Sequence, residues 1–141
     1  MNEILESIVK RLKEVLSGIP VVNQIDGKVT QDLKLALAKS RVCALVGVGR
    51  ITPRVQNADH IVALAEIFVR VFENPFVNRA KTGANTMMGV ATEASAILKY
   101  WKPGGSLSPL VFKEITPVEE ANSEFGSVIT CDAVFNITTE L

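Results

Sequence analysis

The segment Ile61–Phe72 constrains the fold more than any other, because as a strand it is apolar on both faces. Side chains of a strand point alternately to its two faces. The first face carries Ile61, Ala63, Ala65, Ile67, Val69 and Val71, and the second carries Val62, Leu64, Phe68 and Phe72, interrupted by Glu66 and Arg70. A chain of 141 residues has few helices with which to cover two faces of a sheet. We therefore expect one face to pack on the chain's own helices and the other to meet another subunit.

The composition predicts one domain, residues 1–141, without a membrane or nucleic-acid partner. A chain of this length buries a single core. Its 15 basic and 15 acidic residues balance, so no net field attracts DNA or an anionic membrane. We expect neither a signal peptide nor a transmembrane helix, because no basic start precedes an apolar run and no apolar stretch approaches ~20 residues. Cys43 and Cys131 lie in apolar runs, which favours buried free thiols over a disulfide or a zinc site.

Hydrophobic periodicity predicts an α+β fold with a mainly antiparallel sheet, packed by an N-terminal helix and a second long helix. Apolar residues recur at helical spacing over 2–17 and 85–101, and a shorter helix is expected over 30–39. Strands are expected over 42–48, 61–73, 110–115 and 125–138, with a short extended piece at 21–25. Pro53 is expected to end the first of these strands or to mark its edge. The polar residues 54–60 are expected to connect this strand to the strand at 61–73 as a hairpin.

No motif in the sequence predicts catalytic residues, a cofactor or a metal. Gly47-Val-Gly49 lacks the third glycine of a dinucleotide site, and Lys81-Thr82-Gly83 has the wrong order for a phosphate loop. His60 is the one histidine, and nothing in the sequence marks a nucleophile or an orienting group for it. Glu119-Glu120 follows Pro117 and is typical of a solvated turn.

The order of these elements, with certain residues, resembles the tail terminator (tail-completion) proteins of tailed phages and their prophage and tailocin relatives. The similar features are the opening helix Ile4–Leu16, the strand starting Val42-Cys-Ala-Leu-Val-Gly, and the strand ending Val71-Phe-Glu-Asn-Pro-Phe-Val-Asn-Arg79. A helix ending Leu98-Lys-Tyr-Trp-Lys-Pro103 and two closing strands, the last over Val128–Thr138, complete the resemblance. It covers nearly the whole chain.

The resemblance implies a structural protein rather than an enzyme. It implies a small twisted sheet with helices on one side, and a homo-oligomeric ring, commonly a hexamer, that caps the tail tube. Such a ring stops polymerisation of the tube protein and forms the joint to the neck or head connector. It would be found in the host cytoplasm during assembly and then in the virion or tailocin tail.

Two groups of residues are predicted to form the contacts of such a ring. The first is the second face of the long strand, and the second is the loop at 74–84 together with two arginines. The predicted interface residues are Arg50, Arg54, Val62, Leu64, Phe68, Phe72, Asn74, Asn78, Arg79 and Lys81. A solvated loop with no partner is the alternative for 74–84, because most charged loop residues merely face water.

Other functions stay open at this point. Another head–tail joining protein would share the same small α+β design. A small cytosolic enzyme with a site at a subunit interface would need Asp59, His60, Glu73 and Arg79 to converge from the loops 50–60 and 74–84. A ligand-binding module is the third alternative.

Overall fold

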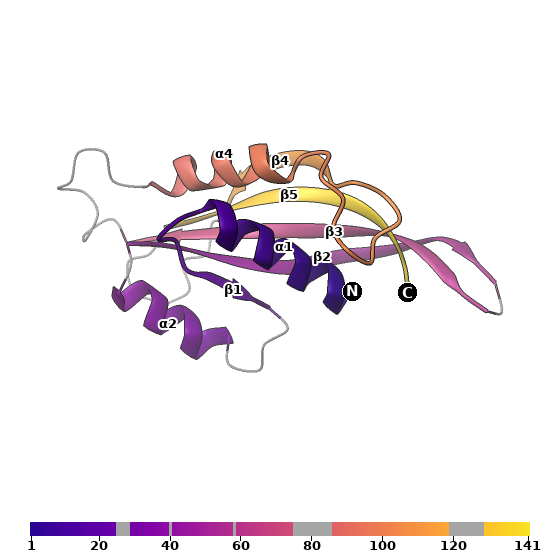
Figure 1. Cartoon of the computed structure of the whole chain (residues 1–141), viewed down its shortest axis with the longest axis horizontal. Coiled ribbons are helices and arrows are strands. Elements are labelled where there is room, and N and C mark those ends of the chain that lie inside the picture. The colour runs from indigo at the N-terminus through magenta and orange to yellow at the C-terminus, as the bar shows by residue number, and fades with distance from the viewer. Residues whose placement is uncertain (25–28, 40, 58, 75–85, 119–128) are drawn as a thin grey trace.

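The computed structural model describes residues 1–24, 29–39, 41–57, 59–74, 86–118 and 129–141 (Figure 1). In chain order the elements are α1 (Asn2–Val15), β1 (Val21–Asn23), α2 (Val29–Lys39), β2 (Val42–Gln56), β3 (Ile61–Glu73), α4 (Met87–Leu98), β4 (Val111–Pro117) and β5 (Ile129–Glu140). The described residues form a five-stranded sheet in the order β1-β2-β3-β5-β4. β1 runs parallel to β2, and the other neighbours are antiparallel. The predicted α+β class and mainly antiparallel sheet are confirmed.

The main core lies between one face of the sheet and the helices α1 and α4 (Figure 1). α1 buries a stripe at helical spacing, and α4 buries a second one. The stripes are Ile4, Leu5, Ile8, Val9 and Leu12 of α1, and Val90, Ala91, Ala94, Ser95 and Leu98 of α4. Beneath them the first face of β3 is fully buried from Ala63 to Val71, as its alternation predicts. Phe135 of β5 is 0% exposed in the same core.

A second, smaller core lies on the opposite face of the sheet, under α2 (Figure 1). Leu33 and Ala36 of α2 pack there with Cys43 and Leu45 of β2 and Phe72 of β3. The resemblance implied helices on one side only, and the structure corrects this because α2 covers part of the other side. The rest of that face, towards the Ile61 end of β3, is not covered by a helix among the described residues.

Several element boundaries differ from those expected, each for a local reason. α1 ends at Val15 rather than at residue 17, and Val15 is 40% exposed at that last position. α4 begins where Thr86 Oγ1 accepts a hydrogen bond from the Gly89 N–H (3.1 Å), which is an ordinary N-cap. It ends at Leu98 rather than near Trp101, because Tyr100 adopts the left-handed conformation (φ 59°) that stops a helix.

β2 continues through Pro53 to Gln56, eight residues beyond the predicted Val48. The outer edge of this part of β2 pairs with no strand among the described residues, since β1 ends where Asn23 lies opposite Val46. A proline costs a strand little at such an edge, because no ladder hydrogen bond is lost on the unpaired side. The expected polar connection at 54–60 is therefore shorter than predicted, because residues 54–56 belong to β2.

Burial makes both cysteines poor nucleophiles. Cys43 and Cys131 are free, and their side chains are 0% and 1% exposed. Burial raises the pKa of Cys43 to about 12 and that of Cys131 to about 11. At neutral pH both groups are therefore thiols rather than reactive thiolates.

We expect Ellman's reagent at pH 8 to label native protein slowly and urea-unfolded protein at once. The unfolded chain supplies the control, because its thiols titrate near the ordinary value of about 8.5. Rapid labelling of the native chain at either cysteine would contradict the buried assignment.

Candidate assembly surface

The β2–β3 hairpin extends past the helices and past the carboxyl end of the chain (Figure 1). We call residues 50–57 and 59–61 the hairpin arm. Its inner strand leads directly into the part of β3 that is paired with β5, which begins where Val62 lies opposite Glu140. Its outer strand, Ile51–Gln56, is exposed at every residue, so both faces of that strand meet solvent. Ile51 is 40% and Val55 is 55% exposed.

The two arginines of the arm occupy irregular positions of β2. Gly49 and Arg50 together lie opposite Glu66, and Arg54 is an extra residue between Pro53 and Val55. Such bulges bend a strand and increase its twist. Bulges, a proline and charged side chains all hinder a second strand from adding to an edge. The arm is therefore suited to contacts through its side chains rather than to extension of the sheet.

The tip of the arm is an ordered polar turn. Asn57 Oδ1 accepts hydrogen bonds from the N–H groups of Asp59 (2.9 Å) and His60 (3.0 Å). The Asn57 N–H in turn donates to the His60 carbonyl (3.0 Å). An asparagine that replaces backbone hydrogen bonds in this way fixes a tight turn. His60 is exposed there.

Next to the arm lies the part of the sheet that α2 leaves uncovered, which we call the open face. It comprises Val62, Leu64, Glu66, Phe68 and Arg70 of β3 with Asp132, Val134, Asn136 and Thr138 of β5. All of the β3 members are half-buried. This face therefore mixes apolar and charged side chains in cross-strand register.

The charges of the open face are paired. The Arg70 guanidinium donates to both carboxylate oxygens of Asp132, from Nε at 2.8 Å and from Nη2 at 2.9 Å. This hydrogen bond raises the pKa of Arg70 above its ordinary value. The same guanidinium lies 5.0 Å from the centroid of the Phe68 ring. Glu66 pairs more loosely with Lys113 of β4, at 3.6 Å. The two-point Arg70–Asp132 contact fixes the orientation of both side chains.

The structure brings together only part of the predicted interface. Arg50 and Arg54 are exposed on the arm, and Val62, Leu64 and Phe68 lie half-buried on the open face.

The remaining predicted residues fall elsewhere. Phe72 is 5% exposed because α2 covers it, so this chain already buries it. Asn74 is half-buried, and its N–H donates to the Arg41 carbonyl (2.9 Å). Asn78, Arg79 and Lys81 lie outside the described residues.

Sequence reasoning missed Ile51 and Val55, the most exposed apolar residues of the arm. The prediction of a polar connection over 54–60, after a strand that Pro53 was expected to end or to mark at its edge, hid them. The available signal was the alternation of Ile51, Pro53 and Val55 with Thr52. This alternation is typical of an edge strand, which tolerates a proline.

The residues named for an interface enzyme do not converge. Asp59 and His60 lie at the tip of the arm, whereas Glu73 ends the same strand, where its Oε1 accepts from the Met87 N–H (2.6 Å). At about 3.3 Å per residue the two ends of β3 are about 40 Å apart. Arg79 is outside the described residues. Within the described ranges no three His, Cys, Asp or Glu side chains are grouped as metal ligands would be.

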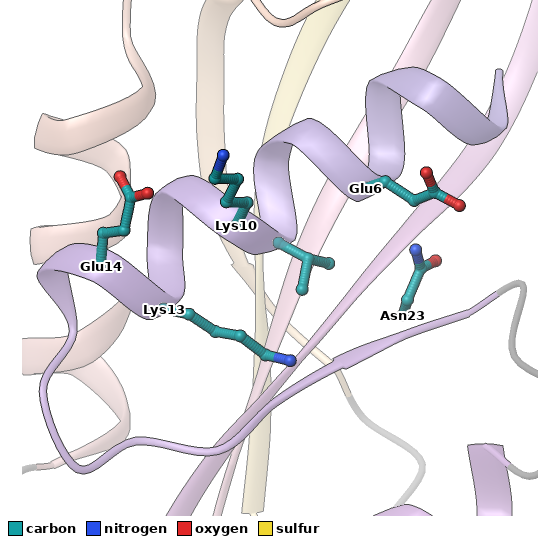
Figure 2. Close-up of a pocket in the computed structure, with 6 residues that line it drawn as sticks. Glu6, Lys10, Lys13, Glu14 and Asn23 are labelled. Atoms are coloured by element: carbon teal, nitrogen blue, oxygen red, sulfur yellow. The ribbon is translucent and has the colours of Figure 1, made fainter.

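Two cavities lie elsewhere, along α1. One of about 500 Å³ separates α1 from β1 and is lined by Glu6, Val9, Lys10, Lys13, Glu14 and Asn23 (Figure 2). Its lining carries both signs of charge. Among the helices described, none is both long and apolar enough to cross a membrane.

Gly47 makes room for the aromatic ring of the open face. A methyl group there would lie 2.5 Å from Phe68 Cζ and 2.7 Å from Gln24 Oε1, far inside contact distance. Gln24 Oε1 also accepts the Val48 N–H (2.9 Å), so it is not free to move without loss of that bond.

We expect Gly47→Ala to destabilise the fold by about 1–3 kcal/mol, the usual cost of overpacking. Gly49→Ala is the matched control, since its nearest obstacle is Glu66 Oε1 at 3.0 Å, the end of a flexible side chain. Urea unfolding of both variants measures the difference. Equal free energies of unfolding for Gly47→Ala and Gly49→Ala would show that the Phe68 ring does not pack against Gly47.

Searches of the sequence against protein families and against curated proteins gave no match. The functional assignment therefore depends on the fold and the surfaces described above.

Proposed function

We propose that this chain is a structural subunit of a phage-type tail that assembles as a ring, caps the tail tube and forms the joint to the neck. The ring is a homo-oligomer, and the resemblance to tail terminators implies six subunits. Its partners are other copies of the chain, the tail tube protein and a neck or head-connector protein.

The observation that carries this proposal is the outer strand of the hairpin arm. It is exposed on both faces and on its outer edge, yet it carries the apolar side chains Ile51 and Val55. A ribbon that covers no core is marginally stable in water. Contact with a neighbouring subunit would bury these side chains and stabilise the extended shape.

The open face supports the same proposal. Val62, Leu64 and Phe68 remain half-buried on one continuous strand beside the arm. Apolar side chains that cluster at a surface mark interaction sites more often than isolated ones do. The paired charges of Arg70 and Asp132 would help to fix the relative orientation of the two subunits, because misaligned charges are costly in an interface.

The oligomeric state tests the ring. Native mass spectrometry and sedimentation of the full chain are expected to give a closed oligomer, near six times the 15.3 kDa of one chain. Negative-stain images should show rings. A monomer at concentrations on the order of tens of micromolar would count against a preformed ring.

A second assay tests the capping. Added to a polymerising tail tube protein from the same particle, the chain is expected to shorten the tubes and to be found at one end. A head–tail joining protein would instead bind the connector and leave tube length unchanged, so the two roles in the particle are separable.

A further inference from the structure

A second cavity, of about 280 Å³, lies on the other side of α1, against the segment that follows α4. It is lined by Ser7, Lys10, Arg11, Glu14 and Trp101. Its volume is roughly nine times the ~30 Å³ that one water molecule occupies in the liquid. Figure 2 shows Lys10 and Glu14 rising together from one side of α1, while Lys13 points away from them towards β1.

Arg11 is the central group of this cavity. Its guanidinium carbon lies 5.6 Å from the centroid of the Trp101 ring, so the aromatic ring holds the side chain in place. Among the described residues the buried Arg11 Nε has no hydrogen-bond partner. A buried donor without an acceptor costs free energy, and a bound ion or water is one explanation for such a group. In the described residues, Arg11 also has no carboxylate within ion-pair distance.

Two further donors line the same cavity. Ser7 Oγ accepts the Gly104 N–H (3.0 Å), which leaves its own O–H able to donate. Lys10 is exposed and, in the described part of the chain, forms no ion pair. A carboxylate is the group that satisfies a guanidinium, an ammonium and a hydroxyl together. Glu14 in the lining disfavours a second negative charge, so a single carboxylate fits better than phosphate or sulfate.

We propose that this cavity binds one carboxylate group, held by Arg11 with Lys10 and Ser7 against the ring of Trp101. The carboxylate belongs either to a small monocarboxylic acid or to an acidic side chain of a docked protein. The proposal does not depend on the ring, because every residue in it comes from one copy of the chain and none lies on the arm or the open face.

The chain contains its own reporter, since Trp101 is the one tryptophan in the sequence. We would titrate the full chain with sodium propionate and with N-acetyl-glutamate α-amide at constant ionic strength, with sodium chloride as the reference salt. We expect a saturable change in Trp101 emission with a Kd of about 1–10 mM, which corresponds to about two charge-assisted hydrogen bonds. Tighter binding of propionate indicates a free acid, and tighter binding of the glutamate amide indicates a protein side chain.

Variants distinguish this site from general charge effects. Arg11→Gln and Arg11→Lys should each weaken binding about tenfold, because lysine keeps the charge but lacks Nε and the planar fork. Lys13→Gln, on the same helix but outside the cavity, should leave the Kd unchanged. Circular dichroism checks that each variant is folded. No saturable change with either carboxylate, or an unchanged Kd in Arg11→Lys, would overturn the proposal.

Discussion

Replacing Phe135 with alanine is expected to destabilise the chain by about 3–5 kcal/mol, the usual cost of removing a fully buried phenylalanine. Phe135 is 0% exposed in the main core. Its ring meets that of Phe112 edge to face, with centroids 5.6 Å apart and planes at 62°. That geometry is favourable beyond the buried area alone. The midpoint of thermal unfolding should fall by on the order of 10 °C.

Phe112→Ala is the matched control for this prediction. It removes the other ring of the same pair, but Phe112 is 39% exposed on the edge strand β4. Phe112→Ala should therefore lower the free energy of unfolding by about 1 kcal/mol. Should Phe135→Ala fail to fold, Phe135→Leu is expected to fold with a loss of about 1 kcal/mol. Equal effects of the two alanine variants would show that the sheet does not pack under α1 and α4 as described.

The sequence was enough to predict the parts of the fold that local patterns determine. The stripe Ile4, Ile8 and Leu12 specifies α1, because those positions share one side of a helix. The double alternation in 61–73 predicts a strand with one face packed on the chain's own helices, and the first face of β3 is buried under α1 and α4. These features follow from side-chain period alone.

Features that depend on distant contacts could not be predicted. The burial of Phe72 requires α2 to pack on the second face of the sheet, and nothing in the pattern of 29–39 says which face it covers. The extension of β2 through Pro53 depends on that edge of β2 having no paired strand among the described residues. The site at Arg11 joins α1 to Trp101, ninety residues later, which no sequence spacing reveals.

The proposed assembly gives the largest functional effect that we expect from a surface substitution. Val55→Lys should abolish ring formation and tube capping while leaving the folded subunit intact. Val55 is 55% exposed on the outer strand of the arm, next to Arg54. A lysine there would bring an unpaired charge into the contact and repel Arg54, and an unpaired charge is costly once it is buried. In the separate subunit the same lysine stays in water, so the free energy of unfolding should change by no more than about 0.5 kcal/mol.

The chain offers a control of the same chemistry. Val15, at the end of α1, is 40% exposed and lies away from the arm and the open face. Val15→Lys adds the same charge, and a cation in the last turn of a helix is mildly favourable. We expect this variant to form normal rings and to cap tubes. Sedimentation, negative-stain images and tube length measure both variants at matched concentration. If Val55→Lys assembles as well as Val15→Lys does, the arm is not a subunit contact, and the proposed ring loses the observation that carries it.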